Sequence, residues 1–305
     1  MAFYRADGAM RERLVDLVAA LEAEGRPGLA NRLSLTWVRY PAPLRGWSEE
    51  RWGGPLEQAG VGAQWRGEQA RYPASVVKLV YLVATEAWVR RQWLGGSDAL
   101  RLALEDMVRQ SSNDATGYVV DVLSGTTSGV ELPPEAFARW SAERQVVNHW
   151  LAELGWPELE GWNACQKTWG DGPYGRERQF YGELRDNRNR LNTEGTARLL
   201  QAVMAGAMVS PPASKRMQGL LARSLDGAQR AADPENQVDG FLGGGLVEGD
   251  QLWSKAGWMS QARHDAAYME GEGFAPTLLV AFSEGRRCAT DETLLPEICR
   301  RLTRG

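Results

Sequence analysis

Cysteine and histidine are scarce in this 305-residue sequence, and their scarcity excludes several kinds of site. The three cysteines, Cys165, Cys288 and Cys299, are odd in number and lack the close spacing of zinc ligands. Neither a disulfide scaffold nor a zinc site is therefore expected. His149 and His264 are the only histidines, and neither lies in a recognisable catalytic context. A Ser-His-Asp triad has few candidates, which favours a lysine as catalytic base.

Long hydrophobic runs and clusters of basic residues are also missing. No apolar segment approaches the length of a membrane span, and the N-terminal MAFYRADGAMRERL has no signal-peptide core. We expect a soluble protein, cytoplasmic as written, or periplasmic or secreted if a signal was removed. The arginines are scattered and the formal net charge is −4, so a nucleic-acid partner is not expected.

The order of predicted elements indicates an α/β (α+β) protein. The 43% hydrophobic and 24% charged residues are typical of one large globular domain or two packed ones. Apolar periodicity and turn residues predict a helix that starts near Ser75, helices at 10–24, 133–155, 193–206, 211–225 and 291–302, helices on both sides of a turn at 111–114, and strands at 33–40, 250–260, 263–273 and 275–285. One antiparallel sheet built from both chain ends, flanked by helices and with an all-helical lobe inserted, satisfies this order.

Two lobes are expected, one of them discontinuous in sequence. The α/β lobe comprises residues 1–74 and 208–305, and the helical lobe comprises residues 75–207. Residues 162–192 are polar, glycine-bearing and weakly periodic, which predicts a long irregular loop. The 13 tryptophans imply extensive aromatic burial or a groove lined by rings, and plain packing is the simpler explanation for most of them.

The segment YPASVVKLVYLVA, residues 72–84, places a serine and a lysine three positions apart in an apolar run. On a helix, Ser75 and Lys78 share a face. Lys78 either extends its charge to water or is desolvated, with a lowered pKa that lets it accept the proton of Ser75. Pro73 fits the first turn of a helix, which places Ser75 near free backbone N–H groups that could hold an oxyanion.

Three short motifs follow one another in the chain: S-V-V-K at 75–78, S-S-N at 111–113 and K-A-G at 255–257. Each is weak alone, but the first opens a helix, the second is a turn between helices and the third lies on a strand. With this set the chain resembles the class A β-lactamase and penicillin-binding-protein family of serine acyl-transfer enzymes. The resemblance implies an α lobe beside an α/β lobe, with the active site between them.

The resemblance implies a role for each motif residue. Ser75 resembles the acylated nucleophile of the family, and Lys78 resembles its general base. Ser111 resembles the hydroxyl that relays a proton to the leaving nitrogen, and Asn113 the amide that holds the substrate's side-chain carbonyl. Lys255 resembles the strand lysine whose charge recognises the substrate carboxylate. The chemistry uses side chains and backbone donors, so no metal or other cofactor is implied.

The resemblance implies an oxyanion hole formed by two backbone N–H groups. These are the N–H of Ser75 and the N–H of Trp258, the residue that follows Gly257 in the K-A-G motif. Two such donors directed at the developing oxyanion are a large part of what a serine hydrolase needs. Trp258 is bulky where the family commonly has a small residue, and its ring could narrow the site or stack over it.

Two further positions depart from the family pattern. Ser112 replaces the usual acidic residue of the second motif, which is a structural position in most members. Ala256 replaces the Thr or Ser that donates a hydrogen bond to the substrate carboxylate, so one anchor is lost. Arg263 on the next strand could supply a bidentate replacement, or it could pair with Asp265.

The residue that activates the deacylating water is the weakest part of the resemblance. Class A enzymes carry a Glu-x-x-Leu-Asn pattern, and the nearest match here is ELRDN, with Glu183 and Asn187 at the same offset. A solvated loop carboxylate is the simpler interpretation of Glu183, and Glu177 is a weaker competitor. Without such a residue the acyl-enzyme would be long-lived.

The sequence therefore predicts a serine hydrolase that forms an acyl-enzyme on Ser75 and hydrolyses β-lactam amide bonds. The alternatives are a penicillin-binding DD-peptidase or esterase of the same fold, and a non-catalytic binding protein. Its partner is a small-molecule or peptide-like acyl substrate, and the oligomeric state is left open.

Overall fold

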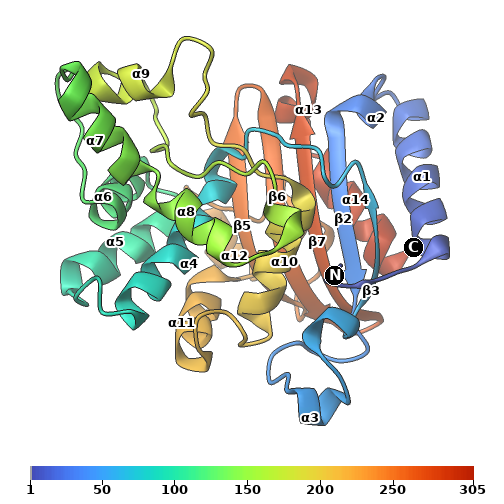
Figure 1. Cartoon of the computed structure of the whole chain (residues 1–305). Coiled ribbons are helices and arrows are strands. Elements are labelled where there is room, and N and C mark those ends of the chain that lie inside the picture. The colour runs from blue at the N-terminus through green and yellow to red at the C-terminus, as the bar shows by residue number, and fades with distance from the viewer. Residues whose placement is uncertain (1) are drawn as a thin grey trace.

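A seven-stranded sheet forms the centre of the computed structural model, which describes residues 2–305. Its order is β1-β3-β2-β7-β6-β5-β4. The strands are β1 (Arg5–Ala6), β2 (Leu33–Arg39), β3 (Val61–Trp65), β4 (Ala222–Arg223), β5 (Gln251–Met259), β6 (Ala262–Gly271) and β7 (Phe274–Glu284). All neighbouring pairs are antiparallel except β1 with β3. Both chain ends contribute to one sheet, which confirms the predicted fold class (Figure 1).

Helices cover both faces of this sheet (Figure 1). The α-helices are α1 (Gly8–Ala23), α2 (Leu29–Arg32), α3 (Glu49–Trp52), α4 (Val77–Arg90), α5 (Asp98–Arg109), α6 (Asn113–Ser124), α7 (Pro134–Arg144), α8 (Val146–Glu153), α9 (Gly175–Tyr181), α10 (Thr193–Met204), α11 (Pro211–Leu221), α12 (Gly227–Ala232), α13 (Arg286–Thr290) and α14 (Leu294–Arg304). The 3₁₀ turns are η1 (Leu56–Gln58), η2 (Ala74–Val76), η3 (Pro157–Leu159) and η4 (Leu242–Gly245). One apolar core joins α4 and α10 to the sheet, and a second joins α1 and α14 to its other face.

Helix α4 is buried on nearly all sides, as expected of a mainly apolar sequence, and the polar Lys78, Thr85 and Glu86 are buried with it. Twelve of its 14 residues are buried, and the side chain of Lys78 is 0% exposed. An amine with no exposed surface does not extend to water. Of the two interpretations of Lys78, the structure therefore supports the desolvated one.

The polar positions of β2 are buried as well, although strict alternation suggests one solvated face. Thr36 lies under the start of α10, where its Oγ1 donates to Glu194 Oε1 at 2.8 Å and lies 2.9 Å from Thr193 Oγ1. The polar face of the strand thus meets polar side chains of a covering helix rather than water.

Three local predictions were wrong. Strand β3 falls in a segment where no strand was predicted, because Gly62 weakens the strand pattern. A Cβ there would come within 2.7 Å of the Trp37 carbonyl, so the close approach of the backbones requires glycine. The helix predicted at 133–155 is divided into α7 and α8 at Gln145. The predicted loop at 162–192 contains α9, although the rest of it is irregular.

Side-chain amides hold this irregular segment in place. Asn189 Oδ1 accepts hydrogen bonds from the backbone N–H groups of Cys165 and Gln166, at 3.1 and 2.9 Å. Its Nδ2 donates to the carbonyl of Gln166 at 2.9 Å.

Packing accounts for Trp140 and Trp150, which are both buried. No helix within residues 2–305 is long and apolar enough to cross a membrane. The boundaries of the two lobes stay a proposal.

Candidate active site

Ser75 lies in the tight turn η2 at the start of α4, and its side chain is half-buried. N–H groups in the first turn of a helix have no partner within the helix. The preceding residue, Ala74, has a φ of 47°, a left-handed conformation that is unfavourable for a residue with a Cβ. Strained backbone of this kind concentrates at functional sites.

Strand β5 comes into close contact with this turn at Gly257. A Cβ on Gly257 would lie 2.9 Å from the carbonyl oxygen of Pro73 and 3.0 Å from the backbone nitrogens of Ser75 and Val76. All three are backbone atoms, which cannot move aside as the end of a flexible side chain could. Glycine is needed here because the strand backbone and the Ser75 N–H are so close.

Gly257→Ala is therefore expected to push β5 away from the Ser75 turn and to lower the rate of Ser75 acylation by about 10–100-fold. The rate is measured with a chromogenic ester or β-lactam, together with the melting temperature. Gly219→Ala on α11 is the matched control, because a Cβ there meets no atom within 4 Å. Equal rates for the two variants would contradict the assigned contact.

Lys78 directs its ammonium group to the second motif rather than to Ser75. Its Nζ donates to the backbone carbonyl of Ser111, to Ser111 Oγ at 3.2 Å and to Asn113 Oδ1 at 3.0 Å. Burial lowers the pKa of Lys78 from 10.5 to about 7. About half of the Lys78 amine is thus neutral at pH 7, and the neutral form is the one that can act as a general base.

Ser111 lies between the two motif lysines. Its Oγ accepts from Lys78 Nζ at 3.2 Å and from Lys255 Nζ at 3.1 Å. Because both lone pairs are then engaged, the hydroxyl proton of Ser111 is left to point elsewhere. Ser111 itself has a φ of 53°, the second left-handed residue of the site. Ser112 caps α6, with its Oγ accepting from the N–H of Ala115 at 3.1 Å.

Lys255 is 1% exposed and has partners that the sequence did not reveal. Its Nζ donates to Gln237 Oε1 at 2.5 Å and to the carbonyl of Ala256 at 2.8 Å, besides Ser111. Burial, and then the positive charge of Lys78, hold the pKa of Lys255 well below its ordinary value. The centre of the site is therefore rich in amines and contains no paired carboxylate among the described residues.

Asn113 is the exposed member of the site, at the start of α6. Its Oδ1 accepts from Lys78 Nζ and from Thr168 Oγ1 at 2.8 Å. Thr168 belongs to the irregular segment at 162–192, which therefore forms one wall of the site. Neither Thr168 nor Gln237 is part of a motif, and no sequence signal singles them out.

The comparisons with known proteins agree with this geometry. A model of the beta-lactamase enzyme family matches residues 56–304. The chain belongs to the beta-lactamase enzyme family. Family and fold together make it a β-lactamase-like hydrolase. No curated protein matches the chain.

Solved structures share the β-lactamase fold over nearly the whole chain. A beta-lactamase from Sphaerobacter thermophilus DSM 20745 is 17% identical, with 95% of each chain covered and a TM-score of 0.61. A mutant of PBP-A, in an acyl-enzyme complex with penicillin G, is 16% identical, with 98% of this chain and 96% of that chain covered and a TM-score of 0.63. A beta lactamase from Xanthomonas campestris pv. campestris str. ATCC 33913 is 15% identical, with 96% and 98% covered and a TM-score of 0.61. At these identities the likeness concerns the fold.

Arg263 is not brought to the β-lactamase-like site, contrary to the prediction. Its register on β6 places it on the sheet face opposite Lys255, because successive strand residues alternate between faces. There its Nε donates to the carbonyl of Ala289 at 3.0 Å, and it does not pair with Asp265. The indole Nε1 of Trp258 donates to the same carbonyl at 2.9 Å, so its ring lies beside α13.

Among the described residues, neither candidate deacylation residue forms a hydrogen bond or ion pair with a motif residue. Glu183 is exposed and has no hydrogen-bond or ion-pair partner among the described residues. Glu177 is 0% exposed, and its Oε1 accepts from Arg144 Nη2 at 2.8 Å and from Ser128 Oγ at 2.9 Å. A carboxylate engaged in a buried ion pair is poorly suited to activate water.

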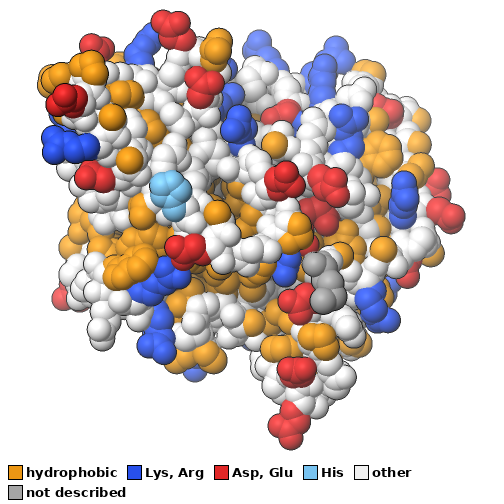
Figure 2. All heavy atoms as spheres, viewed as in Figure 1, with side chains coloured by type: hydrophobic (Ala, Val, Ile, Leu, Met, Phe, Trp, Pro, Cys, Tyr) orange, Lys and Arg blue, Asp and Glu red, His pale blue; other side chains and the backbone are white. Residues whose placement is uncertain are grey.

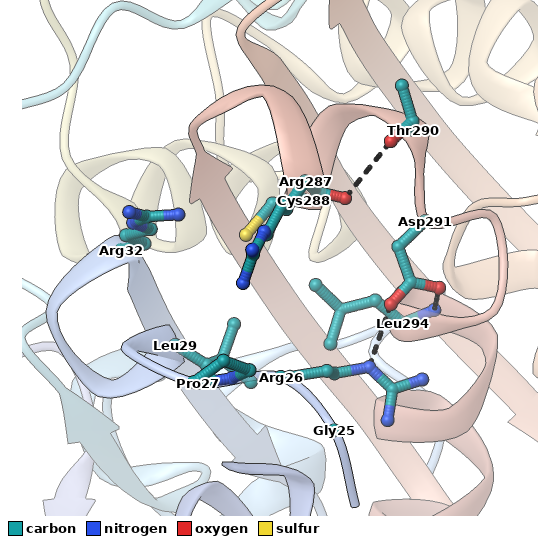
Figure 3. Close-up of a pocket in the computed structure, with 10 residues that line it drawn as sticks. All are labelled: Gly25, Arg26, Pro27, Leu29, Arg32, Arg287, Cys288, Thr290, Asp291 and Leu294. Atoms are coloured by element: carbon teal, nitrogen blue, oxygen red, sulfur yellow. Dashed lines mark hydrogen bonds and ion pairs between the residues drawn. The ribbon is translucent and has the colours of Figure 1, made fainter.

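A further pocket lies on another part of the molecule, between the end of α1 and the α13–α14 region (Figure 3). Leu29 and Arg32 of α2 line it on one side, and Arg287 and Cys288 of α13 line it on the other. It contains none of the predicted site residues.

On the face shown in Figure 2, basic side chains are dispersed among acidic and uncharged ones.

Proposed function

We propose that this β-lactamase-like chain is a serine hydrolase that forms an acyl-enzyme on Ser75 and opens β-lactam amide bonds. The observation that carries the proposal is the buried Lys78 amine, with a pKa of about 7, bonded to both Ser111 and Asn113 at the start of the Ser75 helix. An amine whose pKa is lowered to about 7, one helical turn from a half-buried serine, is the arrangement that activates a hydroxyl nucleophile.

The reaction follows from these positions. Neutral Lys78 accepts the hydroxyl proton as Ser75 Oγ attacks the carbonyl carbon, and the backbone N–H groups of Ser75 and Trp258 hold the resulting oxyanion. Ser111, which accepts hydrogen bonds from both lysines, passes its proton to the leaving nitrogen as the carbon–nitrogen bond breaks, and takes the proton that Lys78 received, so that Lys78 is neutral again. Water then cleaves the ester and restores the Ser75 hydroxyl.

Intact-protein mass spectrometry over time, after mixing with benzylpenicillin and a chromogenic cephalosporin, tests the proposal. Peptide mapping then locates the modified residue. A transient adduct on Ser75 with turnover is the expected result. No adduct with these compounds or with activated esters would overturn the proposal and favour a binding protein.

A specific observation favours slow deacylation as the second candidate. Among the described residues, no carboxylate forms a hydrogen bond or ion pair with Ser75, Lys78 or Ser111. An acyl-enzyme without a nearby base to activate water is long-lived, as expected of a penicillin-binding enzyme. A persistent Ser75 adduct would distinguish this candidate from rapid hydrolysis.

Glu183→Gln is expected to leave the lifetime of the acyl-enzyme within about twofold of wild type, because the Glu183 carboxylate is solvated and unpaired. The lifetime is read from the decay of the adduct mass after excess penicillin is removed. Glu160→Gln, an equally exposed change, serves as control. A tenfold longer lifetime in Glu183→Gln alone would identify Glu183 as the deacylation base.

A further inference from the structure

The side chain of Gln237 occupies a position suited to an anion. Its Oε1 accepts a hydrogen bond from Lys255 Nζ at 2.5 Å and lies 3.4 Å from Arg223 Nη2. An acceptor flanked by a lysine and an arginine is the usual geometry of a carboxylate site. Here the acceptor is a neutral amide of the chain itself.

Lys255 has no donor left for another anion. An ammonium group has three donors, and those of Lys255 are directed to Ser111 Oγ, Gln237 Oε1 and the Ala256 carbonyl. A substrate carboxylate could therefore reach Lys255 only by displacing one of these acceptors. Ala256 offers no hydroxyl as a second anchor.

Gln237 is held where it is rather than resting there by chance. Its Nε2 donates to the carbonyls of Arg109 and Val108, at 2.7 and 3.2 Å, where α5 ends. The side chain is 7% exposed. An adjoining hollow of about 200 Å³ is lined by Arg109, Arg223 and Gln237 among others. Removal of the Gln237 side chain would therefore open space beside the two cations that contact its Oε1, Lys255 and Arg223.

We propose that Gln237 is a specificity-determining residue that directs the site toward acyl substrates without a carboxylate, such as neutral esters and amides. The inference rests on the proposed acyl-enzyme at Ser75. A neutral substrate leaves the hydrogen bonds of Gln237 intact. A carboxylate substrate must break the bond to Lys255 and leave a buried amide without its partner.

The test compares the rates at which benzylpenicillin and its methyl ester acylate Ser75, followed by intact mass. Gln237→Ala is expected to raise the ratio of the acid rate to the ester rate by about tenfold. Gln237→Glu, which puts a fixed carboxylate between Lys255 and Arg223, is expected to lower the same ratio. Gln229→Ala, in the same hollow and exposed, is expected to leave it unchanged.

A purely structural role would slow both probes equally in both Gln237 variants, and an unchanged ratio would overturn the inference alone. Absence of any adduct in every protein would overturn the acyl-enzyme proposal and this inference with it. Sodium sulfate supplies a readout that needs no acylation. At equal ionic strength it is expected to raise the melting temperature of Gln237→Ala more than that of wild type, and equal shifts would overturn the inference.

Discussion

Ser75→Ala is expected to abolish covalent labelling by penicillin and to reduce hydrolysis by at least about 10³-fold. The reason is that no hydroxyl remains at the start of α4 beside Gly257 and the Lys78 amine. Folding should be unaffected, because Ser75 Oγ has no hydrogen-bond partner among the described residues and alanine is a good helix former. Intact mass and a thermal melt check the two halves of the prediction.

Ser210→Ala is a control with the opposite expected result, because it should lose stability but keep covalent labelling. Ser210 caps α11, where its Oγ accepts from the N–H of Ala213, so its removal is expected to cost about 1 kcal/mol of stability. Labelling should persist, since the cap is not part of the site. An adduct that survives in Ser75→Ala would place the nucleophile elsewhere, with Ser111 the first position to examine.

Lys78→Met is expected to lower the rate of Ser75 acylation by about 10²–10⁴-fold, the usual contribution of a general base. Methionine keeps much of the buried volume of Lys78 in α4 while it removes the amine. The rate is measured with a chromogenic ester or cephalosporin in the pre-steady state. Lys215→Met, on the exposed side of α11, is the matched control and should react as wild type does.

The pH dependence of the same reaction distinguishes a base from a merely structural lysine. Because the pKa of Lys78 is lowered to about 7, wild-type acylation is expected to fall as the pH drops below 7 and the amine takes up a proton. In Lys78→Met this decline should disappear, and its persistence would contradict the assignment. The folded chain releases this proton near pH 7, whereas the unfolded chain holds it up to about pH 10.5. The free energy of unfolding is therefore expected to rise between about pH 7 and 10.5.

The use of lysine in this chain agrees with that role. The sequence has only four lysines, Lys78, Lys167, Lys215 and Lys255, and arginine supplies the other positive charges. Lys215 is exposed, whereas the other three are buried. Arginine stays protonated in proteins, while a buried lysine can become neutral, so lysine is the residue that can serve as a base.

The sequence by itself determined the family and the fold class, and its motifs predicted five site residues. These are local properties: Ser75 and Lys78 lie one helical turn apart, and the Ser111–Asn113 turn ends one helix and starts another. Periodicity also located β5, β6 and β7 within about two residues, because each is a continuous pattern of the chain.

Only the tertiary structure decided which other residues share the site. Gln237 and Thr168 are brought to Lys255 and Asn113 by contacts between segments far apart in sequence, which no local pattern encodes. Arg263 is close in sequence to the site strand, but the pleat turns it to the opposite face. The depressed pKa of Lys78 is likewise a property of burial, which depends on every helix and strand packed around α4.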